Sequence, residues 1–275
     1  MRFFFLKKYK PYFILYKQMH TVSIGKQKVP LQTKDNTIAL DNVLKFKPFQ
    51  DWLQLLNKEQ QQYHEEMEIK EILVQNVDEF GSGNIGFIKL KANIQYKATG
   101  KSVPGIVFMR GGAVSVLLIL QSDDPSKEDK TILTLQPRIP VPHYNFPELP
   151  AGMLDDSGDF TGTAAKELYE ETGLKIQEEE LIDLTELAYG DQWKGVYPSA
   201  GGCDEFLRLF LCRKKLKQQE IDDLEGKLTG LRHEGEQIKL KLVSLKDAWK
   251  QSCDMKLLSS LTLYHSLKDK ITFPN

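Results

Sequence analysis

Residues 152–174 read GMLDDSGDFTGTAAKELYEETGL, and this stretch says more about the fold than any other part of the chain. Gly162 or Thr163 can open a helix here, and Gly173 stands where a helix takes a left-handed C-terminal cap. One side of that helix is small and apolar enough to pack on a sheet. Its residues are Ala164, Ala165, Leu168 and Thr172.

The other side of the predicted helix carries three carboxylates, because Glu167, Glu170 and Glu171 are spaced i, i+3 and i+4. Like charges at this spacing repel one another, and Lys166 is the one basic residue close by. Hard cations such as Mg²⁺ or Mn²⁺ prefer oxygen ligands and would relieve the repulsion. A solvated acidic face without a ligand is the alternative, and the spacing alone leaves both open.

The flanking sequence predicts a mixed α/β (α+β) fold. Alternating apolar segments separated by turn residues indicate strands from residue 71 onward. These segments are 72–77, 85–96, 103–109, 113–120, 131–136, 206–212 and 238–243. Segment 113–120 is apolar on both faces and is expected at the centre of a sheet. Helices are expected within 35–70 and after Ser244, where Ser244 and Asp247 have capping-pair spacing.

Composition excludes several protein classes. The 275 residues contain 37 Lys+Arg and 38 Asp+Glu, which gives a formal charge of −1 and no global reason to expect nucleic acid as a partner. The hydrophobic fraction of 41% is enough for a sizeable core. The three cysteines, Cys203, Cys212 and Cys253, lack CxxC spacing and support neither a disulfide framework nor a zinc site.

The near-neutral total hides a basic beginning, because residues 1–34 hold eight basic residues and no acidic one. Their apolar runs are shorter than the roughly 20 residues of a membrane span, and the apolar stretch of a secretory signal is absent. A disordered or upstream-start extension, a targeting peptide and a membrane-surface anchor all stay open. A cytoplasmic location is expected, with a plastid or mitochondrion as the alternative if residues 1–34 are a transit peptide.

Segment 152–174 resembles the Nudix box, Gly-x5-Glu-x7-Arg-Glu-U-x-Glu-Glu-x-Gly-U, in which U is a bulky aliphatic residue. Every spacing matches, but Gly158 stands at the first Glu and Lys166 stands at the Arg. In the family that Arg orients a metal-binding Glu, and Lys keeps the charge without the forked geometry. The resemblance implies a Nudix α/β/α sandwich with a mixed sheet, plus an N-terminal antiparallel β subdomain.

The resemblance extends beyond the box and is strongest to plant-type ADP-sugar diphosphatases, over about residues 70 to 268. Segment 148–152, ELPAG, is similar to the strand that precedes the box in these enzymes. Segment 197–205, YPSAGGCDE, resembles their Ser-Pro-Gly-Gly loop, and segment 230–236, GLRHEGE, resembles a late catalytic loop. The domains implied are a basic extension (1–34), an N-terminal helix and β subdomain (35–110) and a Nudix hydrolase domain (111–270).

The family pattern implies roles for individual residues of this chain. The implied ligands of Mg²⁺, for which Mn²⁺ can substitute, are the Ala151 carbonyl, Glu167, Glu171 and Glu236. The implied catalytic residues are Glu170, Glu234 and Glu236, with Glu234 or Glu236 as general base or final ligand. The implied substrate-binding residues are Arg138, Glu148, Gly201 and Gly202.

The activity implied is Mg²⁺-dependent hydrolysis of the pyrophosphate bond of nucleoside diphosphate sugars. ADP-glucose or ADP-ribose would yield AMP and a sugar phosphate, which for ADP-glucose is the 1-phosphate. A UDP-sugar or broad ADP-ribose diphosphatase is one alternative. A catalytically weak nucleotide-binding module is another, favoured by Gly158 and Lys166. The family also implies a homodimer, with neither nucleic acid nor stable membrane insertion among its partners.

Overall fold

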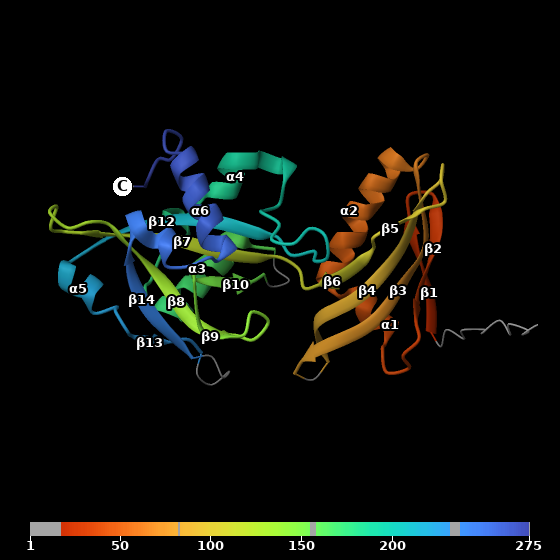
Figure 1. The fold of residues 1–275 in the computed structure, drawn as a ribbon, viewed down its shortest axis with the longest axis horizontal. Helices are drawn as coiled ribbons and strands as arrows, with labels where there is room; N and C mark the ends of the chain where they lie inside the picture. The colour runs from red at the N-terminus through yellow and green to blue at the C-terminus, as the bar shows by residue number, and fades with distance from the viewer. Residues whose placement is uncertain (1–17, 82, 155–157, 232–236, 275) are drawn as a thin grey trace, which may run out of the picture. The chain divides into compact units, whose positions relative to one another are not determined.

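The computed structural model describes residues 18–81, 83–154, 158–231 and 237–274 (Figure 1). The chain divides into two compact units, one ending at Arg110 and the other beginning at Gly111. Each unit has its own sheet and its own core.

The first unit is a six-stranded sheet with the order β1-β2-β3-β4-β5, in which β6 also pairs with β4. Its strands are β1 (Gln18–Ile24), β2 (Gln27–Thr33), β3 (Met67–Phe80), β4 (Asn84–Tyr96), β5 (Ser102–Val103) and β6 (Ile106–Met109). The predicted antiparallel arrangement holds except for β2 and β3, which are parallel. They run the same way because two helices, α1 (Leu40–Lys45) and α2 (Lys47–Tyr63), form the crossover between them.

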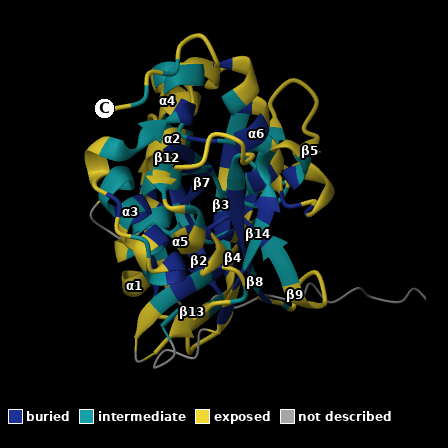
Figure 2. Cartoon of the chain, turned by 90° about the vertical axis from the view of Figure 1, so that its left-hand side faces the viewer, coloured by how far each residue is buried: buried dark blue, intermediate teal, exposed yellow. Residues whose placement is uncertain are grey.

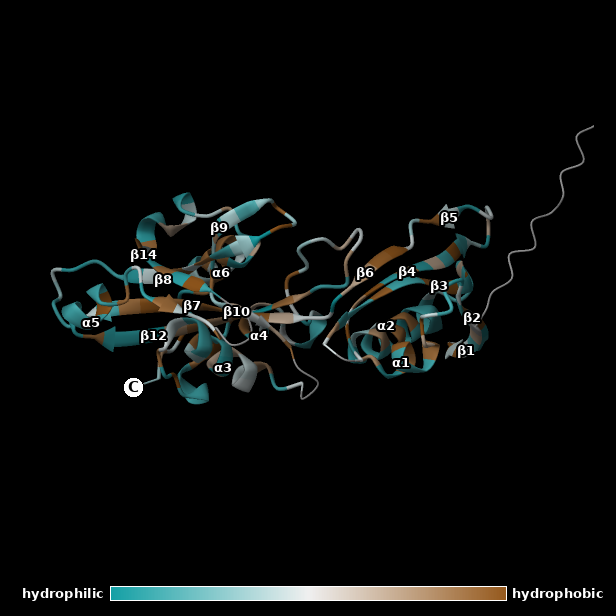
Figure 3. Ribbon diagram, turned by 90° about the horizontal axis from the view of Figure 1, so that it is seen from below, coloured by the Kyte–Doolittle hydropathy of each residue, from teal (hydrophilic) through white to brown (hydrophobic). Residues whose placement is uncertain are grey.

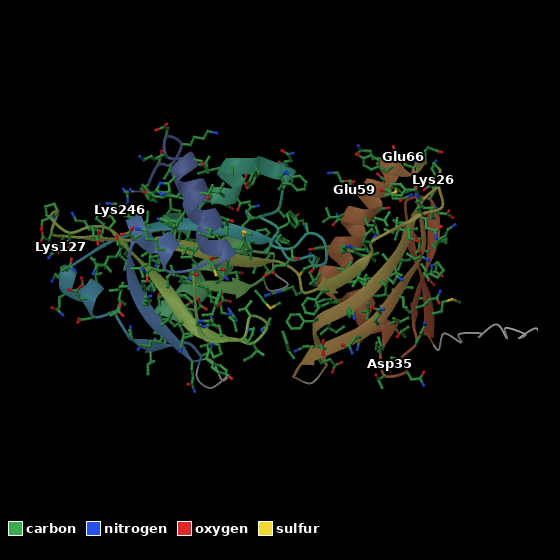
Figure 4. All side chains as sticks on the ribbon, viewed as in Figure 1. Lys26, Asp35, Glu59, Glu66, Lys127 and Lys246 are labelled. Atoms are coloured by element: carbon green, nitrogen blue, oxygen red, sulfur yellow. The ribbon has the colours of Figure 1, made fainter. Side chains whose placement is uncertain are left out.

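Strands β1 and β2 correct the prediction that residues 1–34 form a basic extension. Their apolar residues Val22, Ile24, Val29 and Leu31 alternate inward and are buried in the same core as Phe49 of α2. The basic residues of this part occupy exposed positions instead, as Lys26 does in the turn (Figure 4). The remaining residues of the predicted extension, 1–17, lie outside the described part of the chain.

The second unit is an eight-stranded mixed sheet with the order β11-β12-β7-β8-β14-β13. Its strands are β7 (Ala113–Ser122), β8 (Lys130–Arg138), β9 (His143–Glu148), β10 (Ala151–Met153), β11 (Ile182–Asp183), β12 (Leu207–Leu216), β13 (Leu228–Thr229) and β14 (Ile238–Ser244). Strands β7 and β12 are parallel, whereas β7 and β8 pair only through Leu120 and Lys130. Beyond that pair, β9 pairs with β8 and β10 pairs with β7. The segment between β9 and β10 therefore crosses from β8 to β7.

Both faces of this sheet are covered, which confirms the α/β/α layering. Strand β7 is buried along most of its length, as Figures 2 and 3 show by its dark blue and brown colours. Leu117 and Ile119 face a core that contains Leu257 and Leu261 of α6 (Met255–Ser266). Residues such as Leu118 face the opposite core with α3 (Phe160–Thr172). The shorter helices are α4 (Leu184–Tyr189), α5 (Gln218–Asp222) and the 3₁₀ turns Glu178–Glu180, Gly190–Gln192 and Leu245–Lys250.

The C-terminal helix begins later than the predicted capping pair implied. Residues Leu245–Lys250 form a 3₁₀ turn, and the Ser244 hydroxyl donates to Glu128 at 2.8 Å instead of capping it. Helix α6 starts after Asp254, whose carboxylate accepts a hydrogen bond from the Lys256 N–H at 3.3 Å. No helix in the described ranges is long and apolar enough to cross a membrane.

We predict that the thiol of Cys212 in β12 is unreactive in the folded protein. Burial raises its pKa to about 12, and the nearby Glu180 carboxylate adds to the shift. At pH 8, iodoacetamide should therefore modify the exposed Cys253 and leave Cys212 unmodified until the chain is unfolded. Peptide mass spectrometry of native and unfolded samples measures this, and equal labelling of the two thiols in the native protein would contradict it.

Candidate functional site

The acidic helix α3 is bounded by two local caps. The Asp159 carboxylate accepts a hydrogen bond from the Gly162 N–H at 2.9 Å, so the helix begins at Phe160 rather than at Gly162 or Thr163 as predicted. The predicted C-terminal cap is confirmed, because Gly173 has a φ of 75° and its N–H binds the Tyr169 carbonyl at 2.8 Å. The caps fix where α3 begins and ends, and its apolar residues decide which face meets the sheet.

That face brings one carboxylate into the interior. Ala164, Leu168 and Thr172 are fully buried, as the pattern predicted, and Ala165 is half-buried. Glu171 is only 2% exposed, whereas Glu167 and Glu170 are half-buried. A buried carboxylate needs hydrogen bonds to offset its lost hydration. Strand β10 supplies one of them.

The backbone N–H of Ala151 donates to Glu171 Oε2 at 2.9 Å. The β7–β10 ladder explains why this N–H points at the helix. The neighbouring Pro150 carbonyl accepts from the Val116 N–H at 3.0 Å, and Leu154 N–H donates to Gly112, so these positions form the hydrogen-bonded pairs of the antiparallel ladder. Ala151 lies opposite Ser115, between these hydrogen-bonded positions, so it belongs to a non-hydrogen-bonded pair of the ladder. The N–H and the carbonyl of Ala151 therefore point away from β7.

Gly152 brings the second carboxylate of α3 to the same strand. A Cβ atom at this position would lie 1.8 Å from Cδ and 2.0 Å from Oε1 of Glu167. The Glu167 carboxylate therefore occupies the space that any other residue would fill with its own side chain. This contact is a physical reason for the glycine that opens the motif.

The two departures from the motif lie on the solvent side. Gly158 has a φ of 73°, a left-handed conformation in which the glutamate of the motif would be strained. Lys166 is exposed and forms an ion pair with no carboxylate in the described ranges. The place of Glu167 beside Gly152 therefore does not depend on an ion pair with Lys166.

These residues fit a hard divalent cation in part. Glu167, Glu171 and the Ala151 carbonyl are the oxygen donors that Mg²⁺ and Mn²⁺ prefer, and they meet where α3 lies on β10. Within the described residues, no group of three or more His, Cys, Asp and Glu side chains is arranged to hold a metal. A third side-chain ligand was predicted at Glu236, which lies outside those residues, as does Glu234.

The late loop nevertheless approaches α3 through its described flank. The Thr229 hydroxyl donates to the Glu171 carbonyl, and the Gly230 N–H donates to the Glu170 carbonyl at 3.3 Å. Strand β13, which contains Thr229, therefore reaches the C-terminal end of the acidic helix. This anchor brings the start of the late loop to the helix that carries Glu170, Glu171 and Glu167.

The predicted substrate-binding pair Arg138 and Glu148 is in direct contact. Arg138 Nε donates to Glu148 Oε1 at 2.6 Å, and Glu148 is 2% exposed. The other oxygen, Oε2, accepts from Lys256 Nζ at 2.6 Å. Sequence reasoning missed Lys256, because it lies 108 residues from Glu148 and belongs to no motif.

Gly201 and Gly202 belong to the loop that leads into β12, beside the start of β7. A Cβ atom at either position would meet nothing within 4 Å, so both glycines border open space. The end of this loop is fixed, because the Asp204 carboxylate accepts from the Gly111 N–H at 3.2 Å and 3.3 Å. Ala113 then lies between Met153 of β10 and Leu207 of β12. The loop thus reaches the sheet beside the far end of β10.

Known proteins are similar to this chain in sequence. Residues 109–259 match the family model described as NUDIX domain, a range that contains Arg138, Lys256 and the residues between them. The chain is 43% identical over 236 residues to Nudix hydrolase 14, chloroplastic, of Arabidopsis thaliana, across 85% of this chain and 74% of that protein. It is 30% identical over 206 residues to the ADP-ribose pyrophosphatase of Haemophilus influenzae, across 69% of this chain and 84% of that protein. A crystal structure of an ADP compounds hydrolase covers 74% of this chain and 96% of its own, with 13% identity and a TM-score of 0.49.

We predict that Gly152→Ala weakens metal binding without unfolding the chain. The new methyl group meets the flexible end of Glu167, which can swing away at little cost in stability but then leaves the site. Displacing one ligand should reduce Mn²⁺ affinity by about tenfold or more, measured by isothermal titration calorimetry. Gly201→Ala, which adds a methyl group into open space, is the matched control. Equal Mn²⁺ affinity for Gly152→Ala and wild type would rule out this role of the glycine.

Proposed function

This chain belongs to the NUDIX domain family, and on that premise we propose that it hydrolyses the pyrophosphate bond of nucleoside diphosphate sugars with Mg²⁺ as cofactor. The observation that carries the proposal is the placement of two α3 carboxylates on β10, Glu171 at the Ala151 N–H and Glu167 over Gly152. ADP-sugars are the proposed substrates. The name of the Haemophilus relative, an ADP-ribose pyrophosphatase, supports an adenine diphosphate.

The proposed division of labour follows from the chemistry of a diphosphate. A divalent cation held by Glu167, Glu171 and the Ala151 carbonyl would neutralise the substrate and polarise a phosphoryl oxygen. Arg138 is 41% exposed and directs Nε to Glu148, so the rest of its guanidinium can pair with a phosphate. A water molecule would attack the phosphorus that carries adenosine and the bridging P–O bond would break, which releases AMP and the sugar phosphate.

A glutamate must accept the proton of the attacking water. Glu170, Glu234 and Glu236 are the proposed candidates. Glu170 is half-buried on α3, and its own carbonyl is bonded to Gly230, at the start of the late loop. The late-loop glutamates are proposed from the family pattern alone.

Two features of the protein outside the active site are proposed on the family pattern. We propose a homodimer, and light scattering at micromolar concentration should give twice the chain mass of 31.5 kDa. A measured mass equal to that of one chain would contradict the dimer.

The cytoplasm is the proposed location, and the word chloroplastic in the name of the Arabidopsis relative supports a plastid as the alternative.

The test of the proposed function is a substrate panel with nucleotide products scored by chromatography. ADP-glucose, ADP-ribose, ADP-mannose, UDP-glucose, NADH and CoA are each incubated with Mg²⁺ or Mn²⁺. We expect AMP from the ADP-sugars and slower turnover of UDP-glucose. Faster turnover of UDP-glucose would select the UDP-sugar alternative. Binding of nucleotide sugars with no turnover of any compound would select the catalytically weak module.

We predict that Glu171→Gln reduces AMP release roughly 100-fold or more, because the amide keeps the shape of the side chain but loses a charged ligand. Glu179→Gln is the matched control, since it removes one negative charge from an exposed position on the Glu178–Glu180 turn. Circular dichroism verifies that both variants fold. Activity of Glu171→Gln within about tenfold of wild type would show that the metal assignment is wrong.

A further inference from the structure

The start of α6 contributes a largely buried cation to the Arg138–Glu148 pair. Lys256 Nζ lies 2.6 Å from Glu148 Oε2 and 3.1 Å from Asp254 Oδ1. The side chains of Lys256, Glu148 and Asp254 are 14%, 3% and 8% exposed, whereas that of Arg138 is 41% exposed. Glu148 is therefore compensated from two sides, by a cation in the interior and by one that faces solvent.

This asymmetry matters because a buried carboxylate is costly without a partner. When Arg138 directs its guanidinium at a phosphate, its charge is shared with the substrate and no longer serves Glu148 alone. Lys256 pairs with the other oxygen of Glu148, Oε2, on the side away from solvent. Burial by itself lowers the pKa of Lys256, but Asp254 and Glu148 outweigh burial and raise it, so the ammonium is charged at neutral pH.

The same segment also holds the backbone on both sides of Glu148. The Ser252 hydroxyl donates to the Pro147 carbonyl, and the Leu149 N–H donates to Asp254 Oδ2 at 3.3 Å. Two residues later Ala151 begins β10 and binds Glu171. The start of α6 therefore fixes the segment that leads from the phosphate-binding pair to the metal-binding strand.

We propose that Lys256 is a positioning residue for substrate binding, which fixes Glu148 and thereby aims Arg138 at the diphosphate of the substrate. The inference rests on the proposed function. A lysine with a structural role alone would lower stability when replaced and leave the KM of the folded enzyme unchanged. A positioning role changes KM, because Arg138 holds the substrate in the ground state and in the transition state alike.

The test compares Lys256→Met, which keeps the apolar stem, with Lys256→Arg, which keeps the charge. For hydrolysis of ADP-ribose, we expect Lys256→Met to raise KM about tenfold while kcat stays within about threefold of wild type. We expect the KM of Lys256→Arg to return most of the way to the wild-type value. Lys250→Met is the matched control, because Lys250 pairs with Asp247 on the surface and should leave both constants unchanged. A folded Lys256→Met enzyme with unchanged KM would overturn the proposal.

A second variant keeps the test decisive if Lys256→Met fails to fold. Lys256→Met/Glu148→Gln removes both charges of the buried pair, so no lone carboxylate is left inside. If Lys256 acts through Glu148, the KM of this double variant should equal that of Glu148→Gln alone. A further increase of about tenfold over Glu148→Gln would show an independent role and overturn the proposal.

Binding separates this inference from the proposed function. If the wild type hydrolyses no nucleotide sugar, calorimetry with ADP-ribose gives a Kd instead of a KM. A Kd raised about tenfold in Lys256→Met, with recovery in Lys256→Arg, would support positioning although the proposed hydrolysis had failed. An equal Kd for wild type and Lys256→Met would overturn the positioning role, and so would a wild type that does not bind ADP-ribose.

Discussion

The hydrogen bond from the Ala151 N–H to Glu171 joins the acidic helix to the sheet, and the other contacts of the candidate site are organised around it. It places a nearly buried carboxylate at the start of β10, and the next residue, Gly152, makes room for Glu167. Each contact depends on a particular feature of this strand. The first requires a backbone N–H that the ladder leaves unused, and the second requires a residue without Cβ. The short strand β10 meets both conditions.

A second constraint is the burial of charge at the end of β9, three residues before β10 begins. Glu148 ends β9 and is balanced by Arg138 and Lys256, from elements far apart in the sequence. Segment 147–151 is therefore held from α6, from β8, from β7 and from α3 within five residues. A segment fixed at so many points can hold Arg138, Glu171 and the Ala151 carbonyl in one arrangement, which is what the proposed catalysis by positioning requires.

The sequence predicted the elements with strong local signals. The motif spacing located α3 and its glycine cap, and the uninterrupted apolar run located β7 at the centre of a sheet. It missed β1 and β2, because the basic composition of residues 1–34 obscured the alternation of Val22, Ile24, Val29 and Leu31. It misplaced the start of α3, since the Asp159 cap outweighs the poor helix propensity of Gly162. The pairing of Lys256 with Glu148 depends on tertiary contact alone and has no sequence signature.

The most direct measurement of the central claim is the position of a bound ion. Crystals grown or soaked with Mn²⁺ and measured at wavelengths sensitive to manganese give an anomalous difference map that locates the metal without a model of the site. We predict a peak about 2–2.5 Å from oxygens of Glu167, Glu171 and the Ala151 carbonyl, where α3 lies on β10. A manganese peak elsewhere in the second unit, with Glu167 and Glu171 uninvolved, would contradict it.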